Sequence, residues 1–306
     1  QGQIREQRIK EIQDSAPIRN HYKVPYRGKL KEFPVYQIPL DALIYNKYNG
    51  RILSETKAME SLGSKILAHT KEGKRIIEKL LWDSRIDANQ KTQESLKKLG
   101  QEKIAAISKD GVVIDGNRRT MLLNTLPEYS HLEAVILPLS SYDDSLEIEN
   151  IETQIQMGGD KAIDYDPIQI YLKIQSMYNQ MDPSAVGLTA DYENDNDEFI
   201  PKFDKDNKND KAIKKIYANI GTYKTISKES DIEFFLKVMD TMDEYLYELG
   251  IPEAYPALDG REEQFRGLTT SLGHFYGENS VRPFKGYSDF DVDDYKILAF
   301  DLIRLK

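Results

Sequence analysis

The chain contains no cysteine among its 306 residues. Disulfide bonds, thiolate zinc sites and cysteine nucleophiles are therefore excluded. Its four histidines are scattered without the spacing of two ligands on one strand or helix, so we predict no metal site. The chain also lacks the Gly-x-x-x-x-Gly-Lys-Ser/Thr loop, which excludes the class of nucleotide hydrolases built on that loop.

Long apolar runs are absent as well. No window approaches the roughly 18 uninterrupted apolar residues of a membrane span. Residues 1–13 alternate charged and apolar side chains, unlike a signal peptide. We therefore expect a soluble, cytoplasmic protein without a membrane partner.

An excess of positive charge is also missing, since 42 basic residues face 51 acidic ones and the net charge is -9. A protein that binds nucleic acid over its whole surface concentrates Lys and Arg, and this composition does not. Residues 1–33 are the exception, because basic side chains outnumber acidic ones there. This segment permits a local anion site but no large face for a polyanion.

The length predicts roughly two domains. Strand and helix patterns predict an α+β fold, in which a small mixed-sheet domain precedes a mainly α-helical domain. The predicted parts are a helical, basic extension over residues 1–33, a sheet domain over 34–150 with a helical insertion over 55–100, and a helical domain over 151–306 with an Asp/Asn-rich loop over 182–208 and a helix-turn-helix near 211–249.

Within the sheet domain the expected elements alternate between strands, turns and helices. In chain order they are a strand and one-turn helix over 34–44, a polar turn over 46–51, a helix over 55–82 interrupted near Gly73, a helix over 88–99, strands over 104–107 and 112–114, a helix over 119–125 and a strand over 132–137.

The most informative segment is Asp115-Gly116-Asn117-Arg118-Arg119, where a strand ends and a helix begins. Backbone N–H groups at a helix start point outward with partial positive charge, so an anion can lie there. Gly116 allows close approach of the backbone, and the two arginines offer forked donors to phosphate oxygens. Taken alone, these residues also fit a surface turn with two solvated arginines.

This segment, followed by Thr120, resembles the Gly-x-x-Arg helix start of the ParB/sulfiredoxin superfamily. Its neighbours are similar in the same order: residues 35–44 to the opening strand, Asn46–Arg51 to the polar turn and Ile104–Ile114 to the hairpin before the motif. The resemblance covers residues 34–137, about a third of the chain.

The resemblance implies that the turn contacts the phosphates of CTP, as in ParB proteins, or of ATP, as in sulfiredoxins, together with Mg²⁺. Gly116 and Arg119 match the defining positions of the motif, and Arg51 resembles a second arginine of the family. Asn117 occupies the place of the catalytic cysteine of sulfiredoxins, which excludes sulfinic-acid reduction by that mechanism.

A second ParB motif, Glu-Asn-x-x-Arg, is only partly present. Glu149 and Asn150 match its first two letters, but Thr153 replaces the arginine. This departure weakens the expectation of a ParB-type clamp. Glu152 and Gln156, four residues apart on one helix face, are an alternative pair, and a solvated helix face is another explanation.

Three functions are compatible with these residues. The first is a nucleotide-binding protein acting on or near DNA, in partition, a mobile element or defence, with nucleotide as a switch and a homodimer as its form. The second is an enzyme on the same fold: an NTP hydrolase, a nuclease or a small-molecule kinase. The third is an interaction module with a vestigial pocket. The candidate residues are Arg51, Gly116, Asn117, Arg118, Arg119 and Thr120 for nucleotide binding, and Asp115 and Glu149 for catalysis.

Overall fold

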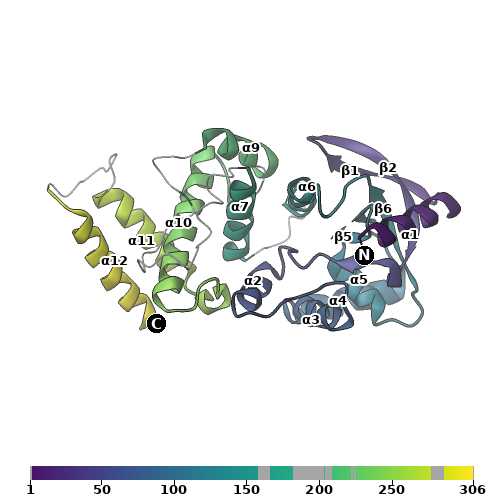
Figure 1. The fold of residues 1–306 in the computed structure, drawn as a ribbon, viewed down its shortest axis with the longest axis horizontal. Helices are drawn as coiled ribbons and strands as arrows, with labels where there is room; N and C mark the ends of the chain where they lie inside the picture. The colour runs from purple at the N-terminus through teal and green to yellow at the C-terminus, as the bar shows by residue number, and fades with distance from the viewer. Residues whose placement is uncertain are drawn as a thin grey trace. The chain divides into compact units, whose positions relative to one another are not determined.

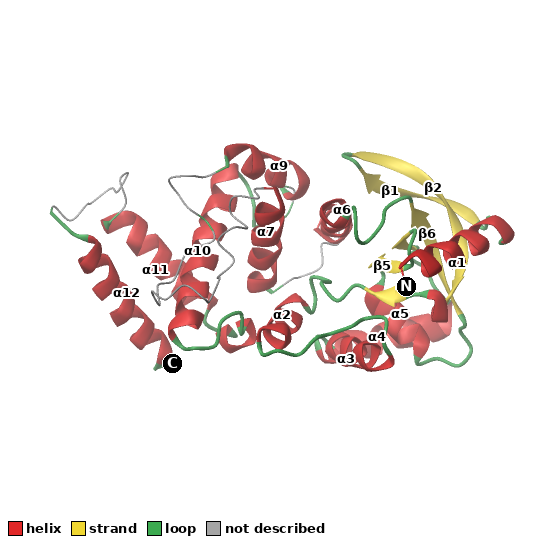
Figure 2. Cartoon of the chain, in the orientation of Figure 1, coloured by secondary structure: helices red, strands yellow, loops and turns green. Residues whose placement is uncertain are grey.

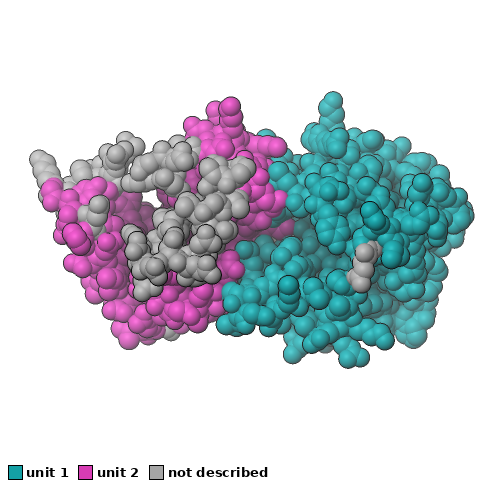
Figure 3. All heavy atoms as spheres, in the orientation of Figure 1, with its two compact units in different colours: residues 1–165, 218–225 teal, residues 166–217, 226–306 magenta. Residues whose placement is uncertain are grey.

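The computed structural model describes residues 2–157, 166–181, 203, 209–221, 223, 225–276 and 286–305. The chain folds into two compact units, which Figure 3 shows in different colours. Unit 1 comprises Gln1–Tyr165 and Ala218–Thr225, and unit 2 comprises Asp166–Tyr217 and Ile226–Lys306. A mixed sheet with helices in unit 1 and helices in unit 2 confirm the predicted α+β class (Figure 2).

Unit 1 is built on a six-stranded sheet of order β1-β2-β6-β4-β5-β3. Strands β1, β2, β5 and β6 are labelled in Figure 1. The pairs β4–β6 and β3–β5 are parallel, and the other neighbours are antiparallel. The strands are β1 (Asn20–Tyr26), β2 (Lys29–Pro39), β3 (Ile44–Tyr45), β4 (Ala105–Ser108), β5 (Val112–Asp115) and β6 (His131–Leu137). The helices are α1 (Gly2–Ser15), η1 (Leu40–Ala42), α2 (Leu53–Ser61), α3 (Lys71–Asp83), α4 (Ile86–Leu99), α5 (Asn117–Asn124) and α6 (Ser145–Met157).

Helices cover both faces of this sheet. Alternate strand residues point to opposite sides, so Ile107 enters one core and its neighbour Ala106 the other. The first core also contains side chains of α1, α3, α4 and α5, and the second contains Ile148 and Ile151 of α6. Strand β4 is accordingly buried along its whole length, and three of its four residues are apolar.

The sheet begins earlier in the chain than the sequence predicts. Residues 1–33 are not only a helical extension, because β1 and the start of β2 form a hairpin closed at Arg27-Gly28. Both turn residues have positive φ, 50° and 75°, as a tight hairpin turn requires. Pro25, which in the sequence suggests a break, lies within β1, an edge strand where proline is tolerated.

The helix predicted over 55–82 is two helices, α2 and α3. The break lies between Ser61 and Lys71 instead of near Gly73. Thr70 caps α3 by accepting a hydrogen bond from the Gly73 N–H at 3.0 Å. Gly73 is required by packing, since a Cβ there would lie 2.0 Å from the Leu67 carbonyl oxygen.

Unit 2 is helical throughout its described residues. Its elements are α7 (Pro167–Met181), α9 (Asp210–Ile220), α10 (Glu229–Glu248), η2 (Tyr255–Leu258), α11 (Glu262–Phe275) and α12 (Asp289–Arg304), with Ala218–Ile220 at the end of α9 assigned to unit 1. Helix α10 packs on α7 and α11. Buried Asp243 of α10 accepts hydrogen bonds from Gln175 Nε2 at 2.8 Å and Tyr255 Oη at 2.7 Å, which ties α7 and η2 to it.

Two expectations for this unit stay predictions. Helices α9 and α10 lie where the helix-turn-helix is predicted, but nothing here tests that motif. The Asp/Asn-rich loop over 182–208 lies outside the described residues except for Phe203. None of the helices described is long and apolar enough to cross a membrane.

Candidate anion-binding site

The glycine turn lies where β5 ends and α5 begins. Gly116 precedes α5 with φ +106°, and no side chain caps this helix start. The first helical hydrogen bond is the one from the Thr120 N–H to the Gly116 carbonyl, at 2.8 Å. The N–H groups of residues 117–119 therefore precede the helical ladder and carry the partial positive charge of the helix start.

Arg118 is half-buried on the side of α5 that packs on α4. Its Nη2 donates to Thr92 Oγ1 at 3.3 Å, and its Nε is buried without a hydrogen-bond partner. Burial, together with the positive charges of Arg51 and Arg85, lowers the pKa of Arg118 to about 10. The guanidinium is still charged at neutral pH, so a desolvated cation lies in a positive field.

Arg119 faces a different set of neighbours. It is partly buried instead of projecting into bulk water, and its Nη1 lacks a hydrogen-bond partner. Burial lowers its pKa, while Asp115 and Tyr22 act in the opposite direction. The two arginines of the motif thus leave two buried donors available on the two sides of one helix start.

Arg51 and Arg85 complete the positive surroundings of Arg118. The sequence predicts Arg51, which ends the polar turn, but it does not predict Arg85. Arg85 immediately precedes α4 and is separated from Arg118 by 33 positions (118 minus 85). No local motif marks it, and only the packing of α4 on α5 places it there.

The side chains of Asn117 and Thr120 are engaged in the fold, and a role of these two residues in nucleotide binding stays a prediction. Asn117 is 2% exposed; its Oδ1 accepts from the Asn46 N–H at 2.9 Å and its Nδ2 donates to the Val113 carbonyl at 2.8 Å. Thr120 Oγ1 donates to the Gly116 carbonyl at 3.0 Å. Their side chains therefore shape the turn, and only their backbone lies at the helix start.

Replacing Asn117 by alanine is expected to destabilise the protein by about 2 kcal/mol, because it leaves a buried N–H and a buried carbonyl without partners. Urea unfolding monitored by circular dichroism measures this. Gln90→Ala, at an exposed position on α4, is the control and is expected to cost well under about 1 kcal/mol. Equal costs for the two variants would contradict the structural role of Asn117.

The predicted catalytic carboxylates have different environments. Asp115 ends β5 beside Arg119, and Glu149 lies half-buried on α6. Within the described ranges, no three His, Asp or Glu side chains are grouped so that they could hold a metal ion. Catalysis by Asp115 and Glu149, and the Mg²⁺ expected with a nucleotide, stay predictions.

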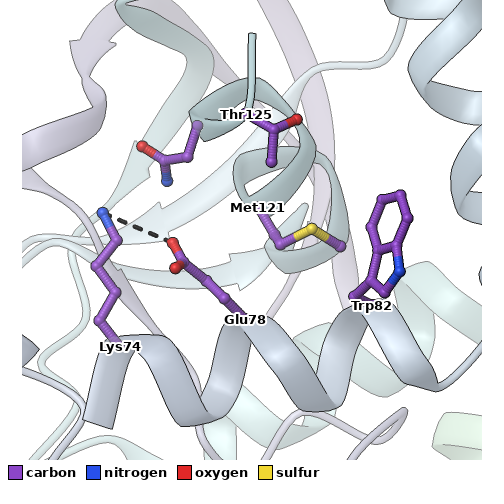
Figure 4. Close-up of a pocket in the computed structure, with 6 residues that line it drawn as sticks. Lys74, Glu78, Trp82, Met121 and Thr125 are labelled. Atoms are coloured by element: carbon purple, nitrogen blue, oxygen red, sulfur yellow. Dashed lines mark ion pairs between the residues drawn. The ribbon is translucent and has the colours of Figure 1, made fainter. Parts of the chain in front are cut away.

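A pocket of ≈ 370 Å³ opens elsewhere on α5, between its C-terminal half and α3 (Figure 4). Its lining is Lys74, Glu78, Trp82, Met121, Asn124 and Thr125. Polar groups in it are already paired: Lys74 forms an ion pair with Glu78 at 3.8 Å, and Tyr45 Oη donates to Glu78 and accepts from Asn124, both at 2.9 Å. The unsatisfied donors are therefore at the other end of the helix.

Comparison with known proteins bears on the fold. No protein-family model matches the chain, and no curated protein is similar to it in sequence. A solved structure described as a Pnob8-like ParB-N domain is similar, with a TM-score of 0.46 and 10% identity over 78% of this chain and 80% of that one. A ParB-N domain is thus among the structures that this chain resembles. At this level of similarity we transfer no residue's role, and the site rests on its own geometry.

Proposed function

We propose that the chain binds the polyphosphate group of a nucleoside triphosphate at the start of α5. The observation that supports this is the pair of buried donors without partners, Arg118 Nε and Arg119 Nη1. A buried donor that lacks an acceptor costs about 1–3 kcal/mol, and more for a charged group. Phosphate oxygens would satisfy both donors and offset the mutual repulsion of the arginines around Arg118.

Charge favours a polyphosphate over a monophosphate as the ligand. Arg51 and Arg85 each act electrostatically on Arg118, and Arg119 is on the same helix turn as Arg118. A triphosphate carries enough negative charge to interact with several guanidinium groups at once. CTP or ATP is the expected nucleotide, and Mg²⁺ would be bound mainly by the phosphates themselves, as is usual for this ion.

Calorimetric titration tests the proposal. Wild-type protein is titrated with CTP, ATP, GTP, ADP and inorganic tripolyphosphate, with and without Mg²⁺, and Arg119→Ala is titrated in parallel. We expect binding that weakens from triphosphate to diphosphate and weakens at least tenfold, roughly, in Arg119→Ala. Absence of heat with every phosphate ligand would refute the proposal, and analysis of the same mixtures for products would separate a binding protein from a hydrolase.

Action on DNA is the second part of the proposed function, and the β1–β2 hairpin favours it. Only residues 35–39 of β2 pair with β6, so the hairpin continues beyond the sheet as a two-stranded ribbon (Figure 1). Four cations lie on it: Lys23, Arg27, Lys29 and Lys31. None of these four side chains forms an ion pair with a carboxylate in the part of the chain that the structure describes.

The geometry of this ribbon suits a duplex. Val24 and Phe33 on one face pack against α6, and the strand register places Lys29 and Lys31 on that same face, nearer the exposed tip of the ribbon. The tip cations surround an aromatic ring, since Arg27 Cζ and Lys31 Nζ each lie 5.3 Å from the Tyr26 ring centroid. A basic two-stranded ribbon has dimensions that the DNA major groove admits.

DNA binding through the hairpin is expected to depend steeply on salt. With four cations against phosphates, log K should fall with log salt with a slope of about -3 to -4, and Lys29→Ala/Lys31→Ala should reduce that slope by about 2. Fluorescence anisotropy with a labelled duplex measures both. The double variant Lys97→Ala/Lys98→Ala is the control, because it removes the same charge from exposed positions on α4. An equal effect of the two double variants, or binding to anionic vesicles in place of DNA, would contradict this role.

A further inference from the structure

The polar turn over residues 46–51 is held at its start and near its end by different helices. At its start, the Asn46 N–H donates to Asn117 Oδ1 of α5. Near its end, Asn49 and Gly50 both donate to Glu152 of α6. The turn that carries Arg51 is therefore fixed between the glycine turn and the helix on the other side of the sheet.

Glu152 is an unusual residue for this position because it is 1% exposed. One carboxylate oxygen, Oε1, accepts from Asn49 Nδ2 at 2.6 Å, from the Gly50 N–H at 3.1 Å and from Gln156 Nε2 at 3.3 Å. Burying a carboxylate is costly unless hydrogen bonds compensate for the lost water. Asn49 and Gly50 belong to the polar turn, so part of this compensation depends on the conformation of that turn.

The side chain of Asn49 connects Glu152 to the backbone of Arg51. Asn49 is 1% exposed, and while its Nδ2 donates to Glu152, its Oδ1 accepts from the Arg51 N–H at 3.2 Å. Its backbone carbonyl accepts from the Ile52 N–H at 3.0 Å, where α2 begins. A chain of hydrogen bonds that starts at the buried Glu152 carboxylate thereby fixes the backbone on both sides of Arg51.

We propose that Glu152 is a positioning residue that acts through Asn49 to hold Arg51 beside Arg118, ready for the phosphate ligand. This inference rests on the proposed polyphosphate site. It assigns Glu152 no contact with the ligand.

The test uses the full chain and inorganic tripolyphosphate as the calorimetric probe. Glu152→Ala and Arg51→Ala are each expected to raise the Kd about tenfold, and the double variant no more than Arg51→Ala alone, because one residue acts through the other. Glu152→Gln keeps an acceptor oxygen for Asn49 and Gly50 and should remain within about twofold of wild type. Glu147→Ala is the control, since it removes from the same helix a carboxylate that accepts the Arg27 N–H at 2.8 Å.

Distinct results separate the possible failures. If wild-type protein does not bind tripolyphosphate, the proposed function itself is wrong. If wild type binds and folded Glu152→Ala binds equally well, or if the double variant shows additive losses, only the positioning role is wrong. Should Glu152→Ala not fold, Asn49→Ala interrupts the same link while the Gly50 bond remains, and it carries the same expected tenfold loss and the same double-variant comparison with Arg51→Ala.

Discussion

Replacing Arg118 by methionine is expected to stabilise the free protein and, at the same time, to weaken polyphosphate binding about tenfold to a hundredfold. The stabilisation, about 1 kcal/mol, follows because methionine fills the same space without a buried donor that lacks a partner and without repulsion from Arg51 and Arg85. The loss of affinity follows because charge-assisted hydrogen bonds to phosphate are worth about 1.5–3 kcal/mol.

Opposite signs for stability and binding distinguish a ligand-binding arginine from a structural one. Thermal unfolding without ligand and calorimetry with tripolyphosphate give the two quantities. Arg75→Met, at an exposed position on α3, is the matched control and should change neither. A free protein that Arg118→Met clearly destabilises would show that the guanidinium serves the fold, and the proposed site would lose its main support.

Gly116→Ala is expected to destabilise the protein by about 3 kcal/mol. Two costs combine: an L-residue at φ +106° is strained by about 1–2 kcal/mol, and the new Cβ would lie 2.9 Å from Ala105 Cβ in the buried strand β4. Because the Cβ would also lie 3.4 Å from Arg119 Nη1, phosphate binding should fall with stability. Urea unfolding with an unchanged m-value measures the first effect.

Two further variants separate strain from collision. Gly63→Ala also places alanine at positive φ, +84°, but in open space, so it should cost only about 1 kcal/mol. Ala105→Gly removes the atom that the new Cβ meets, so the double variant with Gly116→Ala should be more stable than the sum of the single costs predicts. Strict additivity would mean that no close contact exists between these two positions.

Much of the sheet domain could be predicted because its signals are local. The apolar runs of β4, β5 and β6 and the glycine before α5 agree with the structure to within a residue or two. The hairpin of β1 and β2 could not be recognised in the same way. Its apolar side chains alternate with polar ones, but Pro25 and Gly28 suggest a break unless the strand is known to lie at an edge.

The sequence identifies the glycine turn as the candidate site, but not the surroundings of its two arginines. The motif identifies two arginines, but only packing shows that Arg118 lies against α4 and near Arg85 while Arg119 lies near Tyr22. The side-chain amide of Asn117 could contact a ligand, yet its hydrogen-bond partners are backbone groups of Asn46 and Val113. Partners so far apart in sequence leave no local pattern, so chain spacing alone cannot distinguish a residue that binds a ligand from one that shapes the site.

The order of the strands has a consequence for self-association. The margins of the sheet are β1 and β3, and open backbone groups at such margins can recruit strands from other molecules. Strand β3 has only two residues, and β1 carries Lys23 and Pro25, a cation and a residue without an N–H to donate. Both edges are therefore poor templates for fibril-like growth, and they disfavour a dimer in which two copies of this chain share one continuous sheet.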